Sequence, residues 1–175
     1  GDADDVCLGT ARAGNVIGGG DWGIDRLVPD CLRAFEAGKP SMIRSPDSVR
    51  PWQHVLDVIT GYLLLACRVY SSGGDLPHAF NFGPLSSFTV RELVESFYQH
   101  MGAGSWVSES PEEQHLPEAT SLALDSRRAI EMLDWKNYLA LKYWLNKYDY
   151  IYIPENTSPS INVLTKFRPP VKLNV

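Results

Sequence analysis

The chain has 175 residues, 44% hydrophobic and 21% charged, which is enough for one domain with a hydrophobic core. Its formal net charge is −5, and its sixteen lysines and arginines are scattered along the sequence. This pattern argues against a nucleic-acid-binding surface, which needs a basic face, but it suits one small anionic ligand held by two arginines.

The composition favours a protein that is neither secreted nor inserted in a membrane. The longest apolar run, residues 62–67, is much shorter than a membrane-spanning helix. Residues 1–5 are acidic where a secretory signal would be basic, so we expect a cytoplasmic protein. Cys7, Cys31 and Cys67 are far apart in apolar settings, which predicts reduced core cysteines.

The first predicted elements are a strand, a helix and a second strand. Residues 6–12 have the pattern of a short strand and lead into a glycine-rich segment. Asp25 is placed to cap a helix that runs to about Ala37 and ends at Gly38. Residues 41–44 then have the composition of a strand.

The middle of the chain continues this alternation. Residues 45–48 have turn composition, and residues 51–55 are a second extended piece. Asp57 is placed to cap a helix from Val58 to about Tyr70. The spacing therefore predicts one more strand followed by a helix.

The pattern persists to the last helix. Residues 79–82 form a predicted strand, and Thr89 with Glu92 make a capping box for a helix that ends at Gly102. Asp125 is placed to cap a final helix. Because strands and helices alternate almost throughout, the sequence predicts an α/β protein.

From residue 136 the periodic pattern is lost. Residues 138–153 contain five tyrosines and a tryptophan, and residues 154–175 are polar, rich in proline and aperiodic. We expect the last twenty residues to be a poorly ordered tail.

Several catalytic motifs are missing from the sequence. No G-x-x-G-x-x-G is present to hold a dinucleotide pyrophosphate, and residues 18–20 lack its spacing. Tyr143 with Lys147 and Tyr138 with Lys142 have the spacing of a catalytic tyrosine–lysine pair, but they lie in the aperiodic stretch. The four histidines lack metal-ligand spacing. We therefore assign no catalytic residue and no metal.

Two segments remain as candidates for ligand binding. Residues 11–22 run from a strand into glycines, which lets backbone approach a ligand and offers the Asn15 amide to a phosphate or hydroxyl; alternatively, the glycines only make a sharp connection. Arg50 lies between a turn and an extended stretch, suited to a phosphate, unless it is a solvated loop arginine. We expect Trp52 and His54 to be packed and hydrogen-bonded, with His54 neutral.

Together these segments resemble the extended short-chain dehydrogenase/reductase family, specifically its nucleotide-sugar dehydratases and epimerases. The resemblance covers roughly residues 6–135, and its motifs are residues 11–22, 25–29, 50–55, 81–84, 122–126 and 133–135.

The resemblance implies the last strand or strands of a Rossmann-type sheet joined to a small α/β substrate-binding domain. Residues 1–24 would end the sheet and form a substrate loop, and residues 25–135 would bind the sugar nucleotide. Residues 136–175 would be an atypical carboxyl-terminal extension.

The family implies an NAD-dependent nucleotide-sugar 4,6-dehydratase, a lyase of deoxysugar biosynthesis such as that of lipopolysaccharide O-antigens. In such enzymes NAD takes a hydride from the sugar C4, water is eliminated across C5 and C6, and the hydride returns at C6. The Rossmann domain and the catalytic tyrosine–lysine pair would lie outside this chain, which would supply the substrate-binding part. Relatives are usually homodimers or homotetramers.

The favoured ligand is CDP-glucose, and the alternatives are open. The chain could come from an epimerase or from a dTDP- or GDP-sugar dehydratase. It could also be a nucleotide-binding or interaction module without catalysis.

Site residues follow from the resemblance, position by position. Ala13 and Gly14 would lie near the nicotinamide through their backbone groups. Asn15, also close to the cofactor, would contact the diphosphate or sugar of the substrate. Arg26 and Leu27 stand where the family's first helix of the substrate domain touches the nucleotide.

The remaining implied contacts lie later in the chain. Met42 and Ile43 would flank the base, and Arg50 would grip the diphosphate. Asn81 would support the base or ribose side, and His115 stands where many relatives place a phosphate-binding arginine. We expect Arg50 and the loop after the opening strand to face one shared cleft.

Overall fold

The computed structural model describes residues 7–72, 77, 79–109 and 119–139, and the predictions for His115 and for the tail fall outside them. Its elements in chain order are β1 (Thr10–Ala13), β2 (Asn15–Ile17), α1 (Leu27–Glu36), β3 (Ser41–Ile43), β4 (Val49–Arg50), β5 (Trp52–His54), α2 (Val55–Ser72), β6 (Ala79–Phe82), β7 (Phe88–Thr89), α3 (Val90–Met101), β8 (Trp106–Ser108) and α4 (Arg127–Leu133).

The strands pair two by two, mostly in parallel. β1 pairs with β6, β2 with β5, and β3 with β8, all in parallel, while β4 and β7 are antiparallel. Helices α1, α2 and α3 separate these strands in the sequence, as crossover connections between parallel strands require. The predicted α/β class is confirmed.

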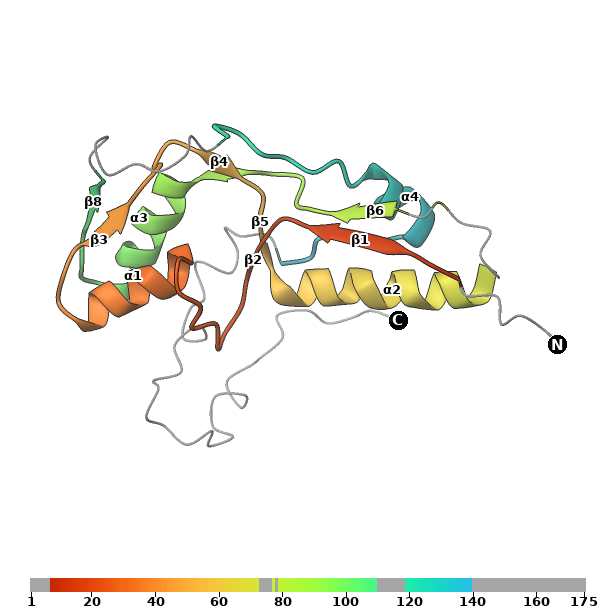
Figure 1. The fold of residues 1–175 in the computed structure, drawn as a ribbon, viewed down its shortest axis with the longest axis horizontal. Coiled ribbons are helices and arrows are strands. Elements are labelled where there is room, and N and C mark those ends of the chain that lie inside the picture. Colours follow the sequence, from red (N-terminus) through yellow and green to blue (C-terminus); the bar gives the residue numbers. More distant parts are fainter. Residues whose placement is uncertain (1–6, 73–76, 78, 110–118, 140–175) are drawn as a thin grey trace, which may run out of the picture.

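The buried hydrophobic residues form two clusters, which belong to the elements at the two ends of the ribbon in Figure 1. The first cluster lies among α1, α3 and strands β2, β3 and β5. Its fully buried members include Cys31, Leu32, Ile43, Leu93 and Val94. The other joins β6, α2 and α4, with Leu65, Phe80, Phe82, Ala129, Leu133 and Trp135. β2 and β5 pair between the two, at the junction where the candidate site lies.

Helix α3 begins and ends as its sequence predicts. The Thr89 hydroxyl accepts a hydrogen bond from the Glu92 N–H at 3.1 Å, and the Glu92 carboxylate accepts one from the Thr89 N–H at 2.7 Å. These bonds to Thr89 lower the pKa of Glu92 below its ordinary value. Gly102 ends the helix in the left-handed region at a φ of 71°.

Asp25 does not cap α1, contrary to the sequence prediction. The helix begins at Leu27 behind Arg26, and no side chain bonds its first N–H groups. Asp25 has a φ of 60°, in the left-handed region, and its carboxylate forms an ion pair with Arg44 at 3.5 Å. A tertiary partner has therefore replaced the local one.

Asp57 does not cap α2 either, because this helix begins two residues earlier, at Val55. The Asp57 carboxylate is buried and accepts hydrogen bonds from Asn137 Nδ2 at 2.7 Å, the Tyr138 N–H at 3.2 Å and the Leu139 N–H at 3.0 Å. Burial raises its pKa above the ordinary value, although the two backbone bonds oppose the shift. The residue joins α2 to the chain that returns after α4.

Asp125 lies one residue before the cap position of α4, which Ser126 occupies. Its carboxylate accepts a bond from the Arg127 N–H at 3.0 Å and pairs with the Arg127 guanidinium, which lowers the Asp125 pKa to about 2. Ser126 instead bonds the backbone of Gly83, donating to its carbonyl at 3.0 Å and accepting from its N–H at 2.8 Å.

The cysteine prediction holds for one residue of three. Cys31 is buried, and burial raises the pKa of its thiol to about 11. Cys7 and Cys67 are exposed, so their placement in the core was wrong. All three are free thiols, as predicted.

Helix α2 is long and apolar enough to cross a membrane by length and composition, with a mean hydropathy of 1.3 over 18 residues. The unbroken apolar run within it is too short to reveal this. One such helix is weak evidence, because the core helices of soluble proteins pass the same test. Only 22% of α2 is buried in the structure, however, so it leaves an apolar face open.

Candidate functional site

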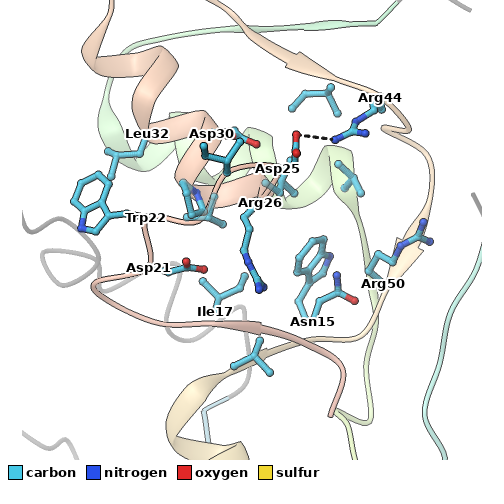
Figure 2. A pocket seen from close by; sticks show the side chains of 18 of the residues that line it. Asn15, Ile17, Asp21, Trp22, Asp25, Arg26, Asp30, Leu32, Arg44 and Arg50 are labelled. Atoms are coloured by element: carbon cyan, nitrogen blue, oxygen red, sulfur yellow. Dashed lines mark ion pairs between the residues drawn. The ribbon is translucent and has the colours of Figure 1, made fainter. Parts of the chain in front are cut away.

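A cavity of about 480 Å³ lies where β2, the loop before α1, the end of β3 and the β4–β5 segment meet (Figure 2). Its charged lining residues are three aspartates and three arginines: Asp21, Asp25, Asp30, Arg26, Arg44 and Arg50. A cavity with balanced charge can bind an anion only if some of its arginines are released from their present partners or already face the ligand.

Two glycines let β2 lie close to β5 and to the start of α2. A Cβ on Gly14 would stand 2.4 Å from the Pro51 carbonyl oxygen, and one on Gly18 would stand 2.6 Å from Cγ1 of Val55. Either contact would push the strands apart. Packing therefore explains these two glycines, as in the alternative that the sequence left open, although Gly18 also lines the cavity.

Asn15 and Trp52 lie opposite each other in the β2–β5 pair, and both line the cavity. The Asn15 N–H donates to the Pro51 carbonyl at 3.0 Å, which fixes the strand. Trp52 is packed as predicted, with 7% of its surface exposed, but its ring N–H has no hydrogen-bond partner among the described residues. The prediction that Trp52 is hydrogen-bonded was wrong.

The guanidinium that reaches into the cavity belongs to Arg26. Figure 2 shows this side chain extending from the start of α1 across the cavity toward Ile17 and Asn15. Leu27, the first residue of α1, also lines the cavity. Arg26 and Asn15 together can donate several hydrogen bonds to one anionic group.

Arg50 lines the same cavity, but its guanidinium is directed away from Asn15 (Figure 2). It is a strand residue with 9% exposure, so the alternative of a solvated loop arginine was wrong. Its Nη1 donates to the carbonyls of Val49 at 3.0 Å and Ala119 at 2.8 Å. The chain around Ala119 runs beside β4, where the Val49 N–H donates to the Thr120 carbonyl at 2.9 Å.

Arg33 fixes the loop before α1. Its guanidinium donates to the carbonyls of Trp22 at 3.1 Å and Gly23 at 2.9 Å and forms an ion pair with Asp30. The Gly23 N–H also donates to the Asp21 carboxylate at 3.0 Å. The loop wall of the cavity is thus held by bonds within its own segment and to α1.

The other predicted site residues are divided. Met42, 55% exposed, and Ile43, 3% exposed, lie on β3 and line the cavity. Ala13 and Gly14 are not among its lining residues. Asn81 lies on β6, outside the cavity lining, and its side-chain amide donates to the Asp125 carbonyl at 3.2 Å.

Several polar or aromatic lining residues were not predicted from the sequence, and four of them are Asp21, Trp22, Asp25 and Arg44. All four are in or next to the two segments selected from the sequence. Their spacing gave no sign that Asp25 and Arg44 would meet, since the residues are separated by a whole helix.

His54 is half-buried and hydrogen-bonded. Its Nδ1 accepts a hydrogen bond from the Leu56 N–H at 3.2 Å, and burial lowers its pKa. The described residues contain no group of three histidine, cysteine or acidic side chains arranged to hold a metal ion.

No family model matches the chain. Over 133 residues it is 44% identical to the CDP-glucose 4,6-dehydratase of Salmonella typhimurium, and the match covers 74% of this chain and 36% of that enzyme. The chain thus spans about a third of the length of the curated relative.

Solved structures with the same fold are also longer than this chain. They include the Stenotrophomonas maltophila UDP-glucose-4-epimerase with NAD (TM-score 0.68, 17% identity, 82% of this chain and 46% of that one). The Bacillus cereus UDP-glucuronic acid 4-epimerase with UDP-glucuronic acid and NAD has a TM-score of 0.65, 15% identity and coverages of 78% and 42%. For the Bacillus anthracis dTDP-glucose 4,6-dehydratase with NAD the values are 0.61, 18%, 78% and 42%.

Proposed function

We propose that this chain, which is similar in sequence to a CDP-glucose 4,6-dehydratase and in fold to the nucleotide-sugar dehydratases and epimerases of the extended short-chain dehydrogenase/reductase family, is the substrate-binding part of an NAD-dependent CDP-glucose 4,6-dehydratase. The sequence relationship favours the CDP-glucose enzyme, because 44% identity over 133 residues is far above the 15–18% shared with the two epimerases and with the dTDP-glucose 4,6-dehydratase.

The observation that supports this proposal is the junction of Asn15, Arg26 and Arg44 at one cavity beside β5. A nucleotide sugar carries a diphosphate, which amide and guanidinium donors bind through charge-assisted hydrogen bonds. On β3, Met42 is more than half exposed and offers apolar contact to a base, while Ile43 beside it is buried in the core. The cavity therefore has donors for the diphosphate next to a surface for the base.

Arg50 requires a rearrangement if it is to grip the diphosphate. Its guanidinium would exchange the carbonyls of Val49 and Ala119 for phosphate oxygens, which are stronger acceptors because they are charged. Without that exchange, Arg50 supports the site by holding the segment at Ala119 beside β4.

In the proposed enzyme, bound NAD would carry out the hydride transfer, and the residues of this chain would make few contacts with it. Pro51 fills the space into which a Cβ at Gly14 would point, so packing occupies that side of the Gly14 backbone. We propose that Ala13, Gly14 and Asn15 contribute at most backbone or amide contacts near the nicotinamide. The roles of Asn81 beside the base or ribose and of His115 at a phosphate stay predictions.

The exposed apolar surface supports the need for a further nucleotide-binding part. On α2, Ile59 is 45% exposed and Leu63 is 62% exposed, and Thr10, Ala11 and Arg12 of β1 are exposed, although only Ala11 of these three is apolar. Parallel sheets are normally covered on both faces, so α2 and β1 present surface that a larger sheet would cover. We propose a cytoplasmic enzyme of deoxysugar biosynthesis, of the kind that feeds O-antigen assembly, that is active only with that part present.

Calorimetric titration of the 175-residue chain with CDP-glucose, and with CDP, UDP, dTDP and GDP, tests the proposal. We expect CDP-glucose and CDP to bind at least about tenfold more tightly than the other nucleotides, a difference worth about 1.4 kcal/mol. Equal affinity for all four diphosphates would contradict the cytidine assignment. Absence of any binding would contradict the substrate-binding function.

A further inference from the structure

Asp25 and Arg44 form an ion pair at the edge of the cavity. Asp25 Oδ1 lies 3.5 Å from Arg44 Nη2, and the side chains are 81% and 45% exposed (Figure 2). Asp25 comes from the loop before α1, and Arg44 directly follows β3. The pair therefore joins two separate walls of the cavity.

The other acidic groups of the cavity are engaged within their own segment. Asp30 pairs with Arg33, and Asp21 accepts the Gly23 N–H. Among the ion pairs of the described residues, Asp25 and Arg44 are the pair in which both partners line the cavity. The charge of Arg44 is thus offset by an acid that a phosphate ligand would meet.

This ion pair is of a kind that a ligand can replace. Exposed pairs contribute little to stability, because water screens the charges and the long side chains lose freedom. A diphosphate carries more charge than one carboxylate, and it can accept two parallel bonds from a guanidinium. The backbone at Asp25 is in the left-handed region, with a φ of 60°. Aspartate, asparagine and glycine tolerate this conformation best, and it places the Asp25 carboxylate at the edge of the cavity.

We infer that Asp25 is an internal competitor for Arg44, and that binding of a diphosphate ligand transfers Arg44 from the Asp25 carboxylate to the phosphates. The inference rests on the proposed binding of a nucleotide sugar in this cavity. Its consequence is selectivity for charge: a ligand without phosphates has nothing with which to replace Asp25, whereas a nucleoside diphosphate does.

The first test replaces Asp25 by asparagine, which keeps the shape of the side chain and tolerates the left-handed backbone. Calorimetry at low ionic strength should show CDP binding about two- to fivefold more tightly to Asp25→Asn than to the unmodified chain. Asp47→Asn is the matched control, since Asp47 is 80% exposed, pairs with Arg91 at 2.9 Å and does not line the cavity. Its affinity should match that of the unmodified chain.

The second test asks whether Asp25 acts through Arg44. Arg44→Gln should bind CDP about five- to tenfold more weakly, because one charged donor is lost. In that background Asp25→Asn should bring no gain, since the residue for which it competes is absent. Affinity for cytidine, which has no phosphate, should be the same in all variants.

The possible results distinguish a failure of this inference from a failure of the proposed substrate-binding function on which it rests. If the unmodified chain binds neither CDP nor CDP-glucose, both are wrong. If it binds them but Asp25→Asn brings no gain, or brings the same gain with and without Arg44, the competition is wrong and the substrate-binding function stands.

Discussion

Asn15 and Arg50 line one cavity, yet the Arg50 guanidinium turns away from Asn15 and bonds the carbonyls of Val49 and Ala119. The shared cleft that the sequence predicts is thus present, but the arginine chosen for the diphosphate is engaged by backbone. Arg26 is the guanidinium that extends toward Asn15.

Arg50→Ala should therefore affect both stability and binding. Removing the side chain leaves two carbonyls without their charged donor, at a cost of about 1–3 kcal/mol in the free energy of unfolding. If Arg50 also reaches the diphosphate, affinity for CDP-glucose falls roughly ten- to a hundredfold. Thermal unfolding and calorimetry measure the two effects, with Arg68→Ala on the exposed surface of α2 as control. A loss of stability with unchanged affinity would restrict Arg50 to the structural role.

Two buried tryptophans can be compared to measure how much a hydrogen bond from the ring N–H contributes to the free energy of unfolding. Trp135 Nε1 donates to the Asp57 carbonyl at 2.9 Å, whereas Trp52 Nε1 has no partner among the described residues. Both are less than 10% exposed. Trp135→Phe should cost about 1 kcal/mol more than Trp52→Phe in denaturant unfolding, because only the former loses an existing hydrogen bond. Equal costs would mean that Trp52 has a partner after all.

The capping box of α3 should make stability depend on pH through Glu92. Its pKa is lowered by the bonds from Thr89, so its contribution is present above the ordinary carboxyl pKa and is lost as the pH falls through the lowered value. Glu92→Gln should cost about 1 kcal/mol at pH 7, and the difference from the unmodified chain should shrink in acid. Glu95→Gln on the exposed surface of α3 is the control. A cost that does not shrink at any acid pH at which the chain stays folded would contradict this assignment.

Asp57→Ala should release the segment after α4. Three donors from residues 137–139 lose their acceptor, and unfolding should become easier by about 2–3 kcal/mol. Amide hydrogen exchange should accelerate at Tyr138 and Leu139 relative to the amides of α3, which do not contact Asp57 and serve as the reference. Unchanged exchange at these two amides would show that Asp57 does not hold them.

Local signals predicted the elements well where the partners are close in sequence. The capping box at Thr89 and Glu92 and the helix end at Gly102 are complete within one segment, and the structure has both. Asp25 and Asp57 carry equally good local signals, but each carboxylate contacts a partner from another element. A cap prediction fails when tertiary contacts compete for the same carboxylate.

The site was predictable in its location and not in its orientation. Asn15, Arg26 and Met42 came from motifs in the sequence, and all three line the cavity. The direction of Arg50 depends on the Ala119 carbonyl, 69 residues away, and the state of Arg44 depends on Asp25 across a helix. No spacing rule within one segment contains that information.

The location of the ligand is tested most directly by NMR of the ¹⁵N-labelled chain. The ring N–H signals of the tryptophans are recorded while CDP-glucose is added. Trp22 and Trp52 line the cavity, and Trp106 and Trp135 do not. We expect the first two signals to shift in a saturable way and the other two to stay in place. Shifts at Trp106 and Trp135, with Trp22 and Trp52 unchanged, would place the nucleotide sugar elsewhere on the molecule and contradict it.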